Sequence, residues 1–388
     1  MISLDTKCVH LQKDTDDKKE DNLEHYGAVS YPIYQTATYA HIGPGKSTGY
    51  DYSRLQNPTR AQVEKVVCQL ENGIDAFALS TGMAAVTLLM EIFGRGDHLI
   101  VDSDLYGGCI RLFDNISVKN GLEFTRTDIC SCDLESLIKS NTKAVYIETP
   151  TNPMMNVTDI EKISRITKAH GILLIVDNTF MSPYLQNPLN LGADIVIHSG
   201  TKYLAGHNDT LAGFIVTNRK DIQNKLRFLI KTTGAGLAPF DSWLVLRGIK
   251  TLGVRMNKSQ ENALKIAQWL KEQDIIKRVI YPGLKEHPGY EIMKKQARGF
   301  GAMLTFEAED EKTALKILDS VRLIQYAESL GGVESLITYP WTQTHADVSE
   351  ELRLKNGITK AVLRLSVGIE DSDDLIADLD QAFKACRD

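Results

Sequence analysis

Short apolar runs alternate with amphipathic stretches from residue 62 to about residue 220 of the chain. The apolar runs have the length of buried strands, and they cover residues 76–79, 99–101, 144–147, 172–176 and 195–197. Between them, apolar residues recur at helical spacing over residues 83–93, 110–120, 134–140 and 160–170. Such an alternation is typical of a sheet with helices on both faces. The pattern therefore predicts an α/β fold with a large doubly wound sheet of parallel or mixed strands.

The later part of the chain has a different organisation. A long helical pattern begins after Asp241 and reaches residue 270, which is long enough to connect a first domain to a second. Beyond it, a strand-like run at 303–306 and an amphipathic stretch at 374–383 predict a smaller α/β domain packed on the first. We therefore predict three parts, which are an arm over residues 1–60, a large domain over 61–250 and a small C-terminal domain over 251–388.

Three local patterns add detail to this organisation. Thr158 and Glu161 have the spacing of a capping box at the start of the helix predicted over 160–170. Residues 13–24 are almost all charged or polar, so they cannot bury apolar area by themselves. Residues 26–59 combine aromatic residues with Gly and Pro and follow neither period, which predicts an extended segment that packs against another surface.

Charge and composition restrict the possible partners. The chain has 388 residues, with 44 Lys and Arg against 50 Asp and Glu, so its formal net charge of −6 argues against nucleic acid. No apolar run approaches the ~20 residues of a membrane-spanning helix, so we predict no membrane partner. The start of the sequence lacks the pattern of a secretory signal, and the expected location is the cytoplasm. Six cysteines are too few for a disulfide scaffold and are expected to be reduced thiols.

Two other motifs suggest sites that their context does not support. The stretch 43–48 ends like a phosphate-binding loop. However, Ala40 occupies the position where the motif requires its first glycine, and Pro44 lacks the backbone N–H that would bind phosphate. Cys130 and Cys132 lack the spacing and the second pair that a zinc site needs. We therefore predict neither a nucleoside triphosphate site nor a metal site.

Lys202 follows the apolar run 195–197, and Asp177 follows the run 172–176. An unpaired ammonium at the end of a buried strand is strongly destabilising, so Lys202 is expected to reach solvent, pair with an acid or take part in chemistry. Open α/β sheets bind ligands at the carboxyl ends of their strands, which places both side chains at one crevice. Ser199 and Thr201 add hydroxyl groups suited to a phosphate. A lysine that forms a Schiff base and a carboxylate that keeps a pyridine nitrogen protonated are what pyridoxal phosphate chemistry requires.

The stretch 194–208, together with Asp177-Asn178-Thr179, resembles the lysine-bearing signature of the Cys/Met-metabolism family of pyridoxal-phosphate enzymes. The resemblance extends from about Tyr26 to the C-terminus. It implies pyridoxal 5'-phosphate as cofactor, small amino acids as substrates and a fold-type-I subunit similar to aspartate aminotransferase, whose large domain binds the cofactor. It also implies a homotetramer, built as a dimer of dimers in which neighbouring subunits share active sites.

The resemblance also assigns roles to individual residues. Lys202 is the expected Schiff-base lysine, Asp177 the partner of the pyridinium nitrogen, and Tyr106 the residue that stacks on the ring and assists the leaving group. The other expected contacts to the cofactor are Gly82, Met83, Ser199 and Thr201, with Tyr52 and Arg54 reaching the site of the neighbouring subunit. The expected contacts to the substrate are Arg364 at the α-carboxylate, Asn152, Ser329, Glu328 and Arg111.

Four features separate the activities of this family. Glu328 resembles the acid of γ-synthases and γ-lyases, where β-lyases often have an apolar residue or a tyrosine. Arg111 resembles the arginine near the distal end of the substrate, and Gly108 stands where methionine γ-lyases typically have cysteine. The stretch 337–345 resembles bacterial γ-synthases that act on activated homoserine. We therefore predict a transsulfuration enzyme of methionine and cysteine biosynthesis that replaces the acyl group of O-acyl-homoserine with cysteine, or another thiol, to give cystathionine.

Other activities on the same scaffold stay open at this point. The nearest alternative is cystathionine γ-lyase or cysteine desulfhydrase activity, and cystathionine β-lyase or O-acetylhomoserine sulfhydrylase activity fits less well. A catalytically silent regulator is disfavoured because the lysine, aspartate, arginine and tyrosine are all present. The sequence leaves open the acetyl or succinyl donor, the preferred thiol and the balance of replacement against elimination.

Overall fold

Two separate sheets form the core of the protein, and the computed structural model describes residues 3–10 and 25–387. The predicted polar segment 13–24 lies outside the described residues. The larger sheet has seven strands in the order β1-β7-β6-β5-β4-β2-β3. These strands are β1 (Asp75–Leu79), β2 (His98–Asp102), β3 (Glu123–Thr127), β4 (Thr142–Glu148), β5 (Leu173–Asp177), β6 (Ile195–Ser199) and β7 (Gly213–Thr217).

The larger sheet is mixed. Strands β3, β2, β4, β5 and β6 run parallel to their neighbours in this order, whereas β7 lies antiparallel to both β1 and β6. All five predicted strands are present, and the prediction missed β3 and β7. Strand β3 has no apolar run because it is an edge strand whose residues stay partly exposed.

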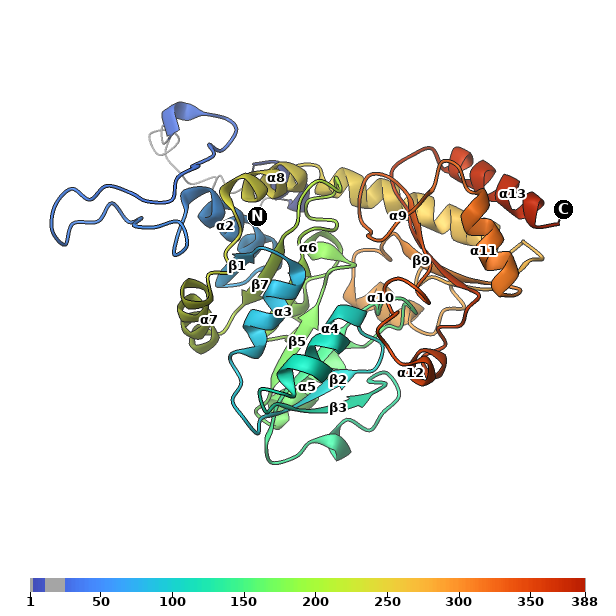
Figure 1. The fold of residues 1–388 in the computed structure, drawn as a ribbon, viewed down its shortest axis with the longest axis horizontal. Coiled ribbons are helices and arrows are strands. Elements are labelled where there is room, and N and C mark those ends of the chain that lie inside the picture. The colour runs from blue at the N-terminus through green and yellow to red at the C-terminus, as the bar shows by residue number, and fades with distance from the viewer. Residues whose placement is uncertain (1–2, 11–24, 388) are drawn as a thin grey trace.

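Helices cover both faces of the larger sheet, because alternate residues of its buried strands point to opposite sides. One face packs against α3 (Gly82–Met90), α4 (Gly107–Leu112) and α7 (Lys220–Thr233). The other packs against α2 (Pro58–Glu71), α5 (Ile160–Ala169) and α8 (Pro239–Ile249). These layers confirm the predicted doubly wound α/β class (Figure 1).

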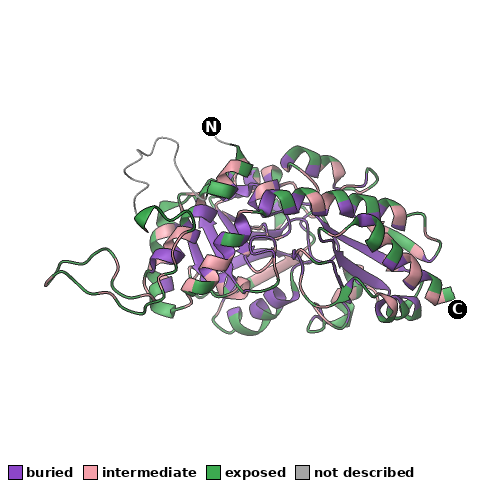
Figure 2. Cartoon of the chain, turned by 90° about the horizontal axis from the view of Figure 1, so that it is seen from above, coloured by how far each residue is buried: buried purple, intermediate pink, exposed green. Residues whose placement is uncertain are grey.

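The second sheet has five strands in the order β10-β11-β12-β9-β8. Its strands are β8 (Ile276–Ile280), β9 (Met303–Ala308), β10 (Gln325–Tyr326), β11 (Leu336–Thr338) and β12 (Val362–Ser366). Its helices are α10 (Tyr290–Gln296), α11 (Glu311–Ser320), α12 (Glu350–Lys355) and α13 (Ser372–Arg387). Figure 2 shows the buried strands of the two sheets as two groups, each with helices whose outer sides are exposed.

The helix α9 (Leu252–Leu270) joins the two sheet regions. It contacts α1 (Leu4–His10) and α6 (Ser182–Leu185) on the side of the larger sheet, and β8, β9 and α13 on the other (Figure 1). The predicted domain boundaries at residues 60 and 250 stay predictions. Residues 28–57 contain neither a helix nor an extended strand, and they form the loop that projects from the body in Figure 1.

Four predictions about helices were wrong in detail. The cap of α5 is Asp159, which accepts the Lys162 N–H at 2.9 Å, because the Thr158 backbone is already bound to Thr149 Oγ1. The segment predicted as a helix over 134–140 forms only a 3₁₀ turn at Glu135–Leu137. The helix predicted over 110–120 instead runs from α4 into a π-helix at Phe113–Ser117. The long pattern after Asp241 is broken between α8 and α9.

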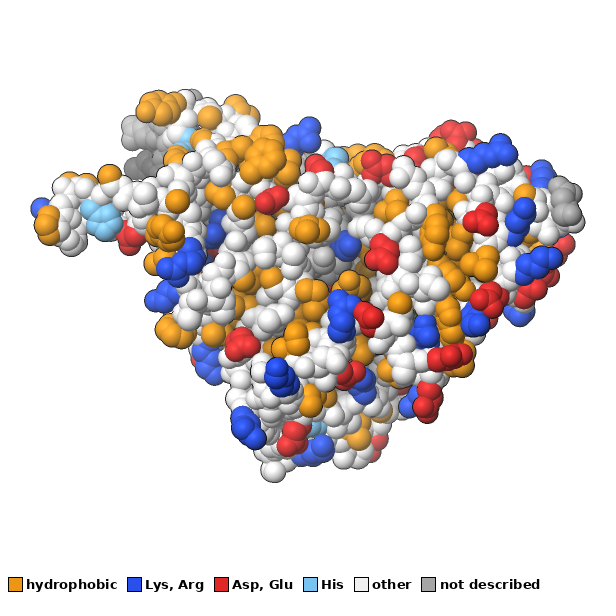
Figure 3. Space-filling view, viewed as in Figure 1, with side chains coloured by type: hydrophobic (Ala, Val, Ile, Leu, Met, Phe, Trp, Pro, Cys, Tyr) orange, Lys and Arg blue, Asp and Glu red, His pale blue; other side chains and the backbone are white. Residues whose placement is uncertain are grey.

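The surface carries both signs of charge. On the face shown in Figure 3, Lys and Arg side chains are interspersed with Asp and Glu. Within the described residues, no helix combines the length and the apolar character that crossing a membrane would require. The same residues contain no group of His, Cys, Asp and Glu side chains that could hold a metal ion.

Candidate active site

A cavity of about 340 Å³ lies where β4, β5 and β6 end. Glu148, Asp177 and Ser199 are the last residues of these three strands, and all of them line it. The loop before β11 and the strand β12 of the second sheet supply the opposite part of its lining. The cavity therefore lies between the two sheet regions, at the edge where open α/β sheets bind ligands.

The cavity brings together most of the predicted site residues. Those that line it are Gly82, Met83, Tyr106, Asn152, Asp177, Ser199, Thr201, Lys202, Glu328, Ser329 and Arg364. Larger cavities exist elsewhere, such as one of about 560 Å³ beside Lys162 and Arg278, but none of the predicted residues lines that one.

Three predicted residues do not line the cavity of their own chain. Arg54 donates a hydrogen bond to the Lys231 carbonyl, and Tyr52 lies on the projecting loop with 45% of its surface exposed. Their position on this loop is compatible with the predicted contact to a neighbouring subunit, which stays a prediction together with the homotetramer. Arg111 forms an ion pair with Asp347, and more than half of each side chain is exposed.

Lys202 lies in the turn after β6 and points its amine toward the second sheet region. Its Nζ donates a hydrogen bond to Ser329 Oγ at 3.0 Å. Burial and the nearby Arg364 lower the pKa of Lys202 from 10.5 to about 8, and the opposing effect of Glu328 is smaller. A lysine with this pKa is partly neutral near pH 8, which is the state that can act as a nucleophile or accept a proton.

This pKa gives a prediction about cofactor loading. Below pH 8 the Lys202 amine is mostly protonated, so the rate of covalent capture of pyridoxal phosphate by cofactor-free enzyme should rise about tenfold per pH unit. Above pH 8 the rate should become constant, whereas an ordinary lysine would let it rise toward pH 10.5. Stopped-flow absorbance between pH 6 and pH 10 would check this, and a rate that still rises at pH 9.5 would contradict it.

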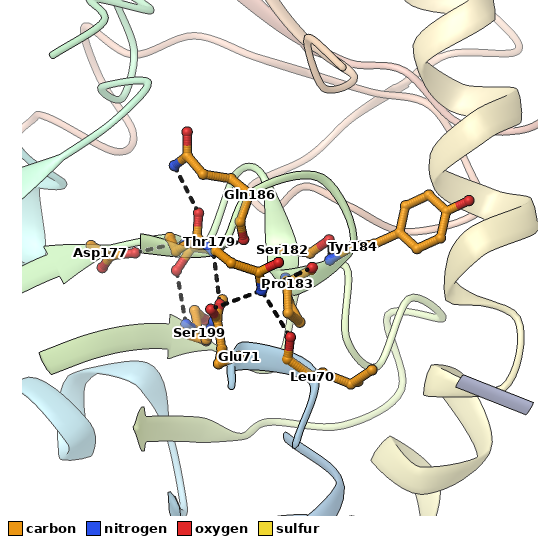
Figure 4. Close-up of polar contacts among 12 residues, drawn as sticks. Leu70, Glu71, Asp177, Thr179, Ser182, Pro183, Tyr184, Gln186 and Ser199 are labelled. Atoms are coloured by element: carbon orange, nitrogen blue, oxygen red, sulfur yellow. Dashed lines mark hydrogen bonds and ion pairs between the residues drawn. The ribbon is translucent and has the colours of Figure 1, made fainter. Parts of the chain in front are cut away.

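Asp177 is held by hydrogen bonds from the segment that follows it. Its Oδ1 accepts the Thr179 N–H at 3.0 Å, and Thr179 Oγ1 in turn accepts the Ser199 N–H at 2.9 Å (Figure 4). Burial raises the pKa of Asp177, while the Thr179 hydrogen bonds and His198 act against this rise. Among the described residues, no lysine or arginine forms an ion pair with Asp177. A cation bound in the cavity, such as a protonated ring nitrogen, would fit this carboxylate.

A buried polar network joins the end of α2 to β6 and to the residue that follows Asp177. His198 and Glu71 form a contact of 2.7 Å between Nε2 and Oε1, and both side chains are at most 1% exposed. Asn178 Nδ2 also donates to Glu71 Oε1, at 2.8 Å. Sequence reasoning missed Glu71, because it lies on α2 and nothing in its local pattern marks a partner on β6.

The phosphate end of the predicted cofactor site lies at the start of α3. Thr81 caps this helix by accepting the Ala84 N–H at 2.9 Å. Gly82 and Met83 are the first two residues of the helix, so their backbone N–H groups have no acceptor within it. A Cβ on Gly82 would lie 3.0 Å from the Ser199 Cβ, and glycine therefore allows the close approach of the two segments. Helix amides beside a serine hydroxyl suit a phosphate.

The opposite end of the cavity holds Arg364, which is 1% exposed. Its guanidinium donates to Asn152 Oδ1 at 2.8 Å, to the Ser329 carbonyl at 2.9 Å and to Thr338 Oγ1 at 3.2 Å. Its Nε has no hydrogen-bond partner among the described residues, and no carboxylate there forms an ion pair with it. Burial lowers the pKa of Arg364 to about 10, which still leaves it cationic. A buried cation with a free donor is suited to the carboxylate of an amino acid.

Tyr106 lines the same cavity and is the N-cap residue of α4. Its ring packs against Gly108, where a Cβ would come within 2.5 Å of Tyr106 Cε1. Phosphate donors, an acid, a lysine, an aromatic ring and an arginine line this one cavity, and together they match what pyridoxal phosphate and an amino acid need. The residues present therefore fit the cofactor that the sequence predicts.

Comparisons with known proteins agree with this geometry. A cystathionine beta-lyase of Lactococcus lactis is 46% identical over 99% of this chain and 100% of its own length. A Bacillus subtilis protein described as cystathionine gamma-synthase/O-acetylhomoserine (thiol)-lyase is 52% identical over 92% of each chain. The crystal structure of cystathionine gamma-lyase from Lactobacillus plantarum, complexed with L-serine, matches all of both chains with a TM-score of 0.95 and 41% identity.

The family model for Cys/Met metabolism PLP-dependent enzymes matches residues 5–384. This match confirms the predicted family, fold class, enzyme class and cofactor, and the relatives named above include a cystathionine beta-lyase and a cystathionine gamma-synthase. The chain belongs to the family of Cys/Met-metabolism enzymes that depend on pyridoxal phosphate.

Proposed function

We propose that this enzyme makes cystathionine by γ-replacement on O-acyl-homoserine. In this reaction the bond between Cγ and the ester oxygen breaks, and a bond forms between Cγ and the sulfur of cysteine. The acyl group leaves as a carboxylate, and the thiol proton is released. The relative with 52% identity, which is described as cystathionine gamma-synthase/O-acetylhomoserine (thiol)-lyase, supports this choice, and so does the stretch 337–345.

The described residues can perform the tasks that this reaction needs. Arg364 binds and orients the substrate α-carboxylate, and Asn152 fixes the guanidinium. Bound pyridoxal phosphate supplies an electron sink for bond breaking at Cα. The Lys202 amine, with its pKa near 8, can accept a proton at Nζ and return it. Tyr106 supplies a hydroxyl in the same cavity, and its raised pKa keeps this hydroxyl protonated.

Glu328 is the observation that favours a reactant with a second amino group, which is cysteine as acceptor or cystathionine. Its exposed side chain lines the cavity beside Lys202, and its charge raises the pKa of both Lys202 and Tyr106. A carboxylate at this place can bind the ammonium group of cysteine, or of the distal half of cystathionine. An enzyme that cleaves only a simple thioether would have no ammonium to bind there.

The experiment compares substrates on the purified holoenzyme. O-acetylhomoserine, O-succinylhomoserine and cystathionine are each offered with and without cysteine, and the products are identified by mass spectrometry. We expect cystathionine from an O-acyl-homoserine and cysteine, at a higher rate than any cleavage of cystathionine. Cleavage without synthesis would overturn the proposal, with 2-oxobutanoate indicating γ-elimination and pyruvate indicating β-elimination.

A variant tests the role of Glu328 in the same assay. Glu328→Gln removes one charge that interacts with the ammonium group, so we expect the KM for cysteine to rise by about tenfold with a smaller change in kcat. Glu350→Gln on α12 is the matched control, because this exposed carboxylate does not line the cavity. An unchanged KM in Glu328→Gln would remove the support that this residue gives to the proposal.

A further inference from the structure

Glu148 is a buried carboxyl group in the cavity that the reaction described above does not use. It is the last residue of β4, it is 5% exposed, and it lines the cavity. In the parallel pairing of β4 with β5, it lies directly beside Asp177. A glutamate in this position needs an explanation, because burying a second acid next to Asp177 is unfavourable.

The contact that Glu148 makes leads to Tyr106. Its Oε2 accepts the Tyr106 backbone N–H at 3.0 Å. Tyr106 is the N-cap of α4 and makes no capping hydrogen bond with its own side chain. The Glu148 carboxyl thus ties the end of β4 to the residue at which α4 begins, and it holds the backbone that carries the Tyr106 ring.

The two neighbouring acids have unequal hydrogen-bond partners. Asp177 accepts from the Thr179 backbone and side chain and interacts favourably with His198, whereas Glu148 accepts one hydrogen bond within the described part of the chain, from the Tyr106 N–H. Burial and the charge of Asp177 both raise the pKa of Glu148 well above its ordinary value. Asp102 and Asp104, on the segment before Tyr106, act in the same direction. Two adjacent buried acids disfavour ionising together, and the hydrogen bonds that Asp177 accepts favour the charge on Asp177 over Glu148.

We propose that Glu148 is a positioning residue, which fixes the Tyr106 ring in the cavity wall by accepting the Tyr106 backbone N–H at the end of β4. The proposal rests on the role of Tyr106 in the proposed function. It extends that function because it names the support of Tyr106.

Substitutions at residue 148 separate the hydrogen bond from the acidity. Glu148→Gln keeps an oxygen that accepts the Tyr106 N–H and stays neutral, so we expect kcat within about threefold of the wild type. Glu148→Ala removes the acceptor and lets the ring move, which should lower kcat by about tenfold or more. The visible absorption and circular dichroism of the bound cofactor should change in Glu148→Ala and not in Glu148→Gln.

A double-mutant cycle shows whether Glu148 acts through Tyr106. In a Tyr106→Ala background there is no ring to position, so adding Glu148→Ala should lower kcat by less than about threefold. Full additivity of the two effects would overturn the proposal, and so would a Glu148→Gln enzyme as impaired as Glu148→Ala. If Glu148→Ala does not fold, Glu148→Asp replaces it in the cycle, and wild-type kcat and spectrum in that variant would also overturn the proposal.

The control variant is Glu64→Gln. Glu64 is also a buried glutamate that accepts a backbone N–H, from Ala78 at 3.0 Å, but it does not line this cavity. Its cofactor spectrum should match the wild type. The cycle uses whichever amino acid the enzyme turns over, including cystathionine, so it remains informative even if synthesis from O-acyl-homoserine is not observed.

Discussion

Replacing Lys202 with alanine is expected to lower kcat by about 10³-fold or more, because it removes both the covalent attachment of the cofactor and the amine that exchanges a proton with the substrate. The Lys202 amine is the one lysine nitrogen lining the cavity in the described part of the chain. Its pKa of about 8 makes it available for both tasks near neutral pH. Steady-state assays and the visible absorption of the cofactor would measure the two losses separately.

Borohydride reduction distinguishes the loss of the covalent link to the cofactor from a general loss of protein stability. In the wild type, reduction should leave the cofactor bound to the chain after denaturation, and peptide mapping should find it on Lys202. In Lys202→Ala the cofactor should wash away. Lys119→Ala, at an exposed position outside the cavity, serves as the control and should behave as the wild type. Steady-state activity retained in Lys202→Ala would refute the assignment.

The strands of the larger sheet and the polar residues at their ends could be predicted, because an apolar run and the residues that follow it are local features of the sequence. Asp177 and Lys202 each follow a short apolar run, and the ends of parallel strands meet at one edge of a sheet. The position of Arg364 was predicted from family resemblance, and the structure shows why a buried arginine is tolerated there, since Asn152 and Ser329 accept its hydrogen bonds.

Contacts between distant segments could not be predicted. Glu71 contacts His198 and Glu148 accepts the Tyr106 N–H, and each pair joins elements that are far apart in sequence. The break between α8 and α9 was missed because the apolar period continues across it. Local patterns describe how a segment is buried, but not which segment covers it.

Substitution of Arg364 should have the second large effect. Arg364→Ala should lower kcat/KM for the amino acid substrate by about 10²–10³-fold, since a buried charge-assisted pair with the α-carboxylate is lost. Arg364→Lys keeps the charge but not the planar fork, so we expect a smaller loss. Both variants remove hydrogen-bond donors from Asn152 Oδ1 and Thr338 Oγ1, which lowers the stability of the fold. The thermal stability of each variant is therefore measured together with its activity.

Selectivity distinguishes substrate binding by Arg364 from a purely structural role. The wild type should strongly prefer the amino acid substrate over the matching amine that lacks the α-carboxylate, and Arg364→Ala should lose most of this preference. Arg255→Lys is the matched control, because Arg255 is also a buried arginine, bound to the Tyr203 and Gly248 carbonyls, that does not line the cavity. Its stability should fall while its selectivity stays unchanged. If Arg364→Ala kept the wild-type preference, the carboxylate would have to bind elsewhere in the cavity, and the orientation proposed here for the substrate would be wrong.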